Sequence, residues 1–214
     1  MGANEKGSAA VATRYPGYDV LAKWSSPDWD DGTRSVVRAR LEEVPPIRFF
    51  TATEAELLEA VARRIVPLCV RDTKLTIPIV PWIDDKLFHD RRDGYRYDTL
   101  PPQREAWRLG LSGIDATARQ VHGHAFIELA AEQQDDVLSR IARGEALGDQ
   151  WSSLPSARFF SVLTATVAKI YYAHPAAWSE IGYSGPSSPR GHVRNWMGGV
   201  DPWDAHEAAP RSST

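Results

Sequence analysis

Apolar residues recur at intervals of three and four in several separate stretches of this sequence, and prolines mark the ends of those stretches. In the first stretch the apolar positions are Leu57, Leu58, Val61 and Ile65, and Pro67 follows them. This spacing places side chains on one face of a helix. Two capping-box spacings precede it, Thr51-x-x-Glu54 and Thr53-x-x-Glu56. The pattern therefore predicts an amphipathic helix that begins near Thr53.

Four further stretches predict helices: a short one over Trp82–Phe88, the longest over 101–122, another over Ala130–Arg143 and a last one over 155–172. The longest carries an apolar stripe, made of Trp107, Leu111, Ile114, Ala118 and Val121. Gly110 and Gly113 lie inside it, and each costs about 1 kcal/mol relative to alanine. We interpret them as points where another helix approaches closely, or as a break into two pieces. No alternating run is long enough for a central strand, so the predicted fold class is all-α.

The segments on either side of the helices lack this periodicity but contain many aromatic residues. We expect three parts: an extended N-terminal arm (1–46), a compact body of about five helices (47–178), and a turn-rich loop with a C-terminal arm (179–214). Disordered segments are poor in aromatic residues, so these rings either pack on the chain's own body or lie along a partner. The residues that we expect to contact a partner are Trp24, Trp29, Tyr183, Trp196, Met197 and Trp203.

Composition argues against several classes of protein. The formal net charge is -3, whereas proteins whose main task is to bind nucleic acid are usually basic. No stretch of 18 or more apolar residues is present, so we expect no membrane span. The N-terminal segment has no apolar core and no paired arginines of a signal peptide, which predicts a cytoplasmic protein. Export together with a partner that carries a signal is the alternative.

The sequence contains only weak indications of a catalytic, cofactor-binding or metal-binding motif. The sequence has no G-x-G-x-x-G and no phosphate-binding loop, so we expect this chain to bind no dinucleotide or flavin. His122 and His124 are two residues apart, and on a helix such side chains point to nearly opposite faces. We therefore expect no catalytic residue and no metal site. A metalloenzyme that uses His122, His124 or His174 is one alternative reading, and a binding or scaffold module for a non-redox partner is another.

An ordered set of segments resembles a known family. The segments are Phe49-Phe50, Thr53–Leu58, Arg64–Pro67, Pro81–Asp84, Gly113–Asp115, His124–Leu129, Gln133–Ile141, Phe159-Phe160, Tyr171–Pro175 and Gly182–Pro186. Together they resemble subunit 3 of gluconate 2-dehydrogenase, the small subunit that accompanies flavin-dependent dehydrogenases of the glucose–methanol–choline type. The resemblance covers roughly residues 48–190.

The resemblance implies a non-catalytic subunit of a hetero-oligomer. It would bind, stabilise and help to mature a larger FAD-containing dehydrogenase or oxidase that acts on the CH-OH group of a sugar, glycoside or related alcohol. FAD is then expected in the partner. The sequence departs from the family pattern in its missing signal and in the segment LCVRDTKLTIPIVP, which stands where the family has an acidic loop rich in glycine and alanine.

Overall fold

The computed structural model describes residues 14–66, 76–92, 94, 99–186, 191 and 204–207. In these residues the α-helices are α1 (Asp31–Glu42), α2 (Ala52–Ile65), α3 (Ile79–Phe88), α4 (Gln103–His122), α5 (Ala131–Arg143), α6 (Ser156–Ala173) and α7 (Pro175–Trp178). Three short 3-10 helices accompany them: η1 (Val20–Ser25), η2 (Phe126–Glu128) and η3 (Asp149–Ser152). The described residues contain no β-strand, which confirms the all-α prediction. None of these helices combines the length and the apolar character that crossing a bilayer requires.

The chain divides into two compact units. Unit 2 is Arg40–His174 and holds α2 to α6, the five helices that the sequence predicts for the body. Unit 1 combines Met1–Ala39 with Pro175–Thr214. The structure thus assigns the segments expected as two separate arms to one unit, and its divisions fall at 39/40 and 174/175.

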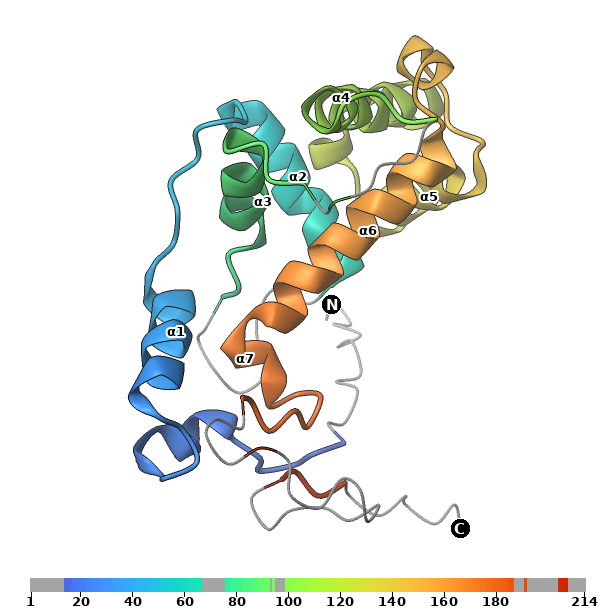
Figure 1. Cartoon of the computed structure of the whole chain (residues 1–214). Helices are drawn as coiled ribbons and strands as arrows, with labels where there is room; N and C mark the ends of the chain where they lie inside the picture. Colours follow the sequence, from blue (N-terminus) through green and yellow to red (C-terminus); the bar gives the residue numbers. More distant parts are fainter. Residues whose placement is uncertain are drawn as a thin grey trace, which may run out of the picture. The chain divides into compact units, whose positions relative to one another are not determined.

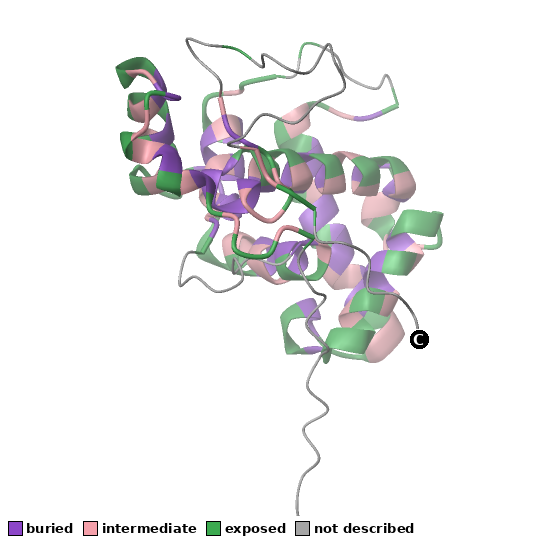
Figure 2. Cartoon of the chain, turned by 90° about the horizontal axis from the view of Figure 1, so that it is seen from below, coloured by how far each residue is buried: buried purple, intermediate pink, exposed green. Residues whose placement is uncertain are grey.

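Unit 2 is built by the packing of α6 against α3 and α5, and of α4 against α5 (Figure 1). Figure 2 shows buried and exposed residues together on the same helical ribbons. The core positions with no exposed surface include Leu58, Val61, Ile83, Ile114, Val137, Ile141, Leu163 and Val167. These are the apolar stripes that the 3.6-residue period produces, and burying such faces is the main source of helix stability in a protein.

Two helix starts show how local sequence sets the boundaries. At α2 the first of the two predicted capping boxes forms: Thr51 Oγ1 accepts from the Glu54 amide at 3.2 Å, and the Glu54 carboxylate accepts from the Thr51 amide at 2.8 Å. Helix α3 begins at Ile79 rather than at Trp82. Pro81 is compatible with this earlier start, because amides in the first turn have no partner within the helix.

Helix α4 is continuous through both of its glycines. A Cβ at Gly110 would lie 2.1 Å from Cζ of Phe159 on α6, and one at Gly113 would lie 2.6 Å from the ring of Trp151 in η3. The interpretation as close-approach points is confirmed, and the break into two helices is not present. The Trp151 indole donates to Thr117 Oγ1 at 3.1 Å, which ties η3 to α4.

The expectation that residues 1–46 are irregular was wrong for α1. The side chain of Asp30 caps the first turn of this helix: its Oδ1 accepts a hydrogen bond from the Thr33 amide at 2.7 Å. Only Thr33 and Val37 are buried along this helix. Because so little of α1 faces a core, its sequence lacks the apolar stripe by which the other helices are recognised.

Candidate functional site

A fully buried carboxylate joins α3 to the segment before α2. Asp84 has no exposed surface. Its Oδ1 accepts from the amide of Arg48 at 2.7 Å, and its Oδ2 accepts from the amides of Phe49 and Phe50 at 2.9 and 2.8 Å. Hydrogen bonds to a charged acceptor are among the strong ones, so this carboxylate can remain buried. Asp84 therefore holds the start of the body in place and does not face a substrate space.

The neighbouring Asp85 lies under a group of basic side chains. Arg48 Nη2 is 2.6 Å from one of its oxygens, Arg91 pairs with the other, and His89 Nδ1 lies 3.2 Å away. The Arg48 guanidinium also lies 4.2 Å from the ring centroid of Phe88. Phe88 is 41% exposed, so Arg48 and Phe88 form a surface pair of a cation and an aromatic ring.

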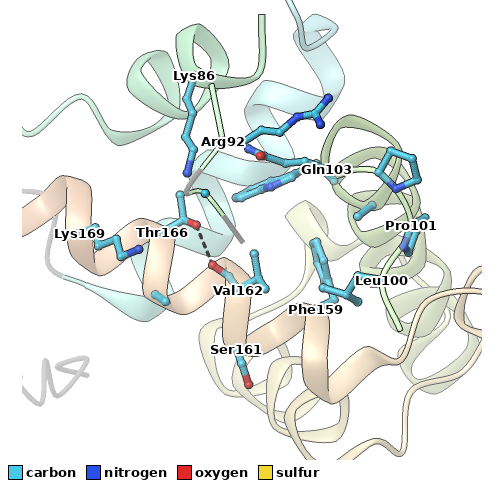
Figure 3. Close-up of a pocket in the computed structure, with 15 residues that line it drawn as sticks. Lys86, Arg92, Leu100, Pro101, Gln103, Phe159, Ser161, Val162, Thr166 and Lys169 are labelled. Carbon is cyan, nitrogen blue, oxygen red and sulfur yellow. Dashed lines mark hydrogen bonds between the residues drawn. The ribbon is translucent and has the colours of Figure 1, made fainter. Parts of the chain in front are cut away.

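A cavity of about 480 Å³ opens between α3, α4 and α6 of unit 2 (Figure 3). Its described lining residues are Lys86, Arg92, Gly94, Leu100, Pro101, Pro102, Gln103, Ala106, Trp107, Phe159, Ser161, Val162, Ala165, Thr166 and Lys169. The two hydroxyl groups among them are used within α6. Thr166 Oγ1 donates to the Val162 carbonyl at 2.8 Å, and Ser161 Oγ donates to the Ala157 carbonyl at 3.0 Å.

Sequence reasoning did not identify this cavity. Its walls come from three helices that are far apart in the sequence, so no local motif marks it. One feature of the sequence could have indicated the cavity. Helix α6 is apolar along most of its length, and its only charged residues are Arg158 and Lys169. A lysine near the end of such a helix either reaches water or lines a polar space.

The histidines proposed for the alternative metalloenzyme lie in different surroundings. His122 Nε2 is 3.1 Å from Asp136 Oδ2, and hydrogen bonds from Arg140 and then His122 lower the pKa of that carboxyl. His124 is exposed, whereas His174 is only 6% exposed, and burial lowers its pKa. Among the residues that the structure describes, no three His, Cys, Asp or Glu side chains are grouped to hold a metal. Cys69 lies outside those residues.

Two of the predicted partner contacts, Trp24 and Trp29, lie in unit 1. Their rings meet edge to face with centroids 6.1 Å apart. Trp29 is 1% exposed, and its ring reaches Gly185, where a Cβ would lie 3.0 Å from it. The Arg38 guanidinium lies 5.3 Å from the ring of Trp24, which is half-buried. The ring of Trp29 therefore packs within its own unit, and partner contact through either residue remains a prediction.

The other predicted contacts fall in the C-terminal part of unit 1. Tyr183 is 41% exposed, and its ring packs edge to face against Trp178 at 5.4 Å. It is thus supported on one side and open on the other, as an interface residue would be. Trp196, Met197 and Trp203 lie outside the described residues.

Comparison with known proteins gives one result. No curated protein and no solved structure was found to match the chain. A family model described as gluconate 2-dehydrogenase subunit 3 matches residues 52–185, which run from the first residue of α2 to the glycine that packs against Trp29. That span is more than half of the 214 residues and includes all five helices of unit 2. The chain therefore belongs to the gluconate 2-dehydrogenase subunit 3 family.

Proposed function

We propose that this chain is the non-catalytic small subunit of a hetero-oligomer, in which it binds, stabilises and helps to mature a larger FAD-dependent oxidoreductase. The partner would act on the CH-OH group of a sugar, glycoside or related alcohol. FAD would be held by the partner, where it accepts a hydride from the carbinol carbon. This chain would supply contact surface and stability.

The family match over residues 52–185 carries the proposal, because the family is described as a subunit of a dehydrogenase. Two features of unit 2 support a protein partner. The ring of Phe88 is 41% exposed under the guanidinium of Arg48, and arginine and aromatic side chains are enriched where interfaces hold their binding energy. Ile47, the residue before Arg48, is 40% exposed. We call Ile47, Arg48 and Phe88 the Arg48–Phe88 surface.

Co-purification tests the proposal. The tagged chain would be expressed with and without a candidate FAD-dependent dehydrogenase from the same organism, and the eluate examined for a second band, for a flavin spectrum and for dye reduction with sugars. We expect all three with the flavoprotein present, and less flavin in the flavoprotein when it is made alone. If the folded chain is recovered without the flavoprotein, the proposal is wrong.

A matched pair of variants locates the contact. Phe88→Ala removes the ring from the Arg48–Phe88 surface, and Ile127→Ala removes a side chain of η2 that is equally exposed, at 41%. We expect Phe88→Ala to reduce the amount of flavoprotein recovered and Ile127→Ala to leave it unchanged. Equal recovery with both variants would place the contact elsewhere on the chain.

A further inference from the structure

Two prolines set the conformation of the segment between α1 and α2. The structure assigns no helix or turn to residues 43–48, and Figure 1 shows an extended stretch of chain leading from α1 to α2. A proline ring fixes φ of its own residue and keeps the preceding residue out of the α region. Val44 precedes Pro45, and Pro45 precedes Pro46, so these residues are restricted to extended or polyproline II backbone. We call residues 43–48 the proline segment.

The proline segment exposes two aliphatic side chains. Val44 is 52% exposed and Ile47 is 40% exposed. A polyproline II backbone repeats about every three residues, so it places these two side chains on one face. Pro46, which lies between them in the sequence, is exposed as well. The result is an apolar ridge that is continuous with the Arg48–Phe88 surface through Ile47.

Both ends of the proline segment are fixed to unit 2. At one end the Arg48 amide donates to Asp84 at 2.7 Å, and the Arg48 guanidinium lies 2.6 Å from Asp85. At the other end Arg40, in the last turn of α1, donates to the Ala173 carbonyl at 3.0 Å. A segment that is already held in place loses little conformational entropy on binding, which favours its use as a recognition element.

The backbone of the proline segment offers acceptors rather than donors. The carbonyls of residues 44–47 make no hydrogen bond with any residue that the structure describes. Pro45 and Pro46 have no N–H group, so the segment is unsuited to pairing with the edge of a β-sheet. A partner has to cover the aliphatic side chains and also donate to these carbonyls. Tryptophan and tyrosine do both, because each carries an N–H or O–H donor on an apolar ring.

We propose that the proline segment docks in a groove lined by tryptophan and tyrosine side chains on the larger subunit. The groove belongs to the FAD-dependent partner of the proposed function, on which this inference rests. Aromatic-lined grooves are a recurring way of binding polyproline II segments. The side chains of Val44 and Ile47 lie against the rings, and the carbonyls of the segment accept hydrogen bonds from the indole and phenol groups.

The dissociation rate of the purified complex tests the role of the prolines. The complex with the candidate FAD-dependent dehydrogenase is immobilised through the tag on this chain, and release of the flavoprotein is followed. Pro45→Ala together with Pro46→Ala keeps the aliphatic side chains but frees the backbone, so release should become about tenfold faster. Pro45→Gly together with Pro46→Gly should accelerate it further. Pairing as a β-strand predicts the opposite sign, because the alanine variant gains two N–H donors.

A matched pair of variants tests the aliphatic face. Ile47→Ser removes an apolar side chain that is 40% exposed, and Ile127→Ser removes one in η2 that is 41% exposed. We expect Ile47→Ser to accelerate release at least about fivefold and Ile127→Ser to leave it unchanged. A photoreactive aliphatic residue with a diazirine group, placed at position 47, should cross-link to a part of the flavoprotein that contains tryptophan or tyrosine. The same residue at position 127 should give no cross-link.

The outcomes separate this inference from the proposed function, once thermal melts show that each variant is folded. If the unchanged chain recovers no flavoprotein, both are wrong. If the complex forms but dissociates at the same rate, or more slowly, after both prolines are replaced by alanine, only the polyproline II docking is wrong. Equal release from Ile47→Ser and Ile127→Ser would also overturn it. So would cross-links from position 47 that reach no tryptophan-containing or tyrosine-containing part of the partner.

Discussion

The ring of Phe159 lies against the backbone of Gly110, so that a Cβ at that glycine would be 2.1 Å from the Cζ atom of the ring. The two residues join α4 to α6, and Phe159 also meets Trp107 edge to face at 6.0 Å. The ring is 1% exposed, so nearly all of its surface is already covered by other residues. The absence of a side chain at position 110 is therefore a requirement of the packing.

Gly110→Ala should destabilise the chain despite the better helix propensity of alanine. Overpacking a core costs about 1–3 kcal/mol, and the gain in propensity returns about 1 kcal/mol. We expect a lower urea midpoint for this variant, whereas Gln120→Ala, at an exposed position of the same helix, should change it little. Adding Phe159→Leu should recover part of the loss. An increase in stability from Gly110→Ala alone would contradict the packing described.

Asp84→Asn should destabilise unit 2 strongly. The carboxylate accepts three backbone hydrogen bonds, whereas an amide offers one oxygen and turns its NH₂ group toward a donor. Leaving one buried donor unsatisfied costs about 1–3 kcal/mol. Chemical denaturation should show a loss of at least this size. Asp90→Asn, which affects an exposed pair with Arg92, should have a much smaller effect and serves as the control.

The stability of the chain should fall as the medium becomes mildly acidic, in part because of His174. Burial lowers the pKa of this residue, and the positive charge of Arg40 acts in the same direction, although a hydrogen bond with the Arg40 backbone offsets some of the shift. The unfolded chain then takes up the proton at higher pH than the folded chain does. The contribution of neutral His174 to the stability of the fold is complete above about pH 6.5 and is lost progressively as the pH falls below that value.

Urea unfolding of the parent and of His174→Gln at neutral pH and at about pH 5.5 checks this expectation. The variant should lose less stability between the two conditions than the parent does. An identical loss in both proteins would show that the acid sensitivity comes from other groups.

Trp29 and Tyr183 should respond differently to replacement by alanine. Removing a buried tryptophan costs about 3–5 kcal/mol, and Trp29 is 1% exposed, so Trp29→Ala should disrupt unit 1 and change the tryptophan fluorescence. Tyr183 is 41% exposed, so Tyr183→Ala should largely preserve the fold and lower the affinity for the flavoprotein instead. A full-affinity complex formed by Tyr183→Ala would remove this residue from the interface.

The sequence predicted the helical body well, because each of its helices buries an apolar face and has a clear stop. Helix α4, expected over 101–122, is observed at Gln103–His122, and α6, expected over 155–172, is observed at Ser156–Ala173. Helix α1 escaped prediction because it buries only two side chains and starts from a local cap at Asp30. The strength of a pattern in the sequence thus followed the amount of surface that a helix buries.

The candidate site was less accessible to sequence reasoning. The presence of Lys86 and Lys169 in the lining of one cavity depends on the packing of α3 against α6, and no spacing within one segment encodes it. The role of Asp84 is similar, since its three partners precede it by more than thirty residues. The aromatic content of the arms did indicate packing, and for Trp29 that packing is within the chain.

Unit 1 combines one segment that precedes unit 2 in the sequence with one that follows it, so its two parts are synthesised at different times. The amide of Val20 donates to Ser179 Oγ and the ammonium of Lys23 to the Ser184 carbonyl, each across about 160 positions. At about 5–20 residues per second, a ribosome delivers the second segment roughly 10–30 s after the first. By then the ribosome has synthesised all of unit 2, which can fold first. The aromatic residues of the first segment have not yet met the second segment. A chaperone, or a partner that folds at the same time, would have its best opportunity to act in that interval.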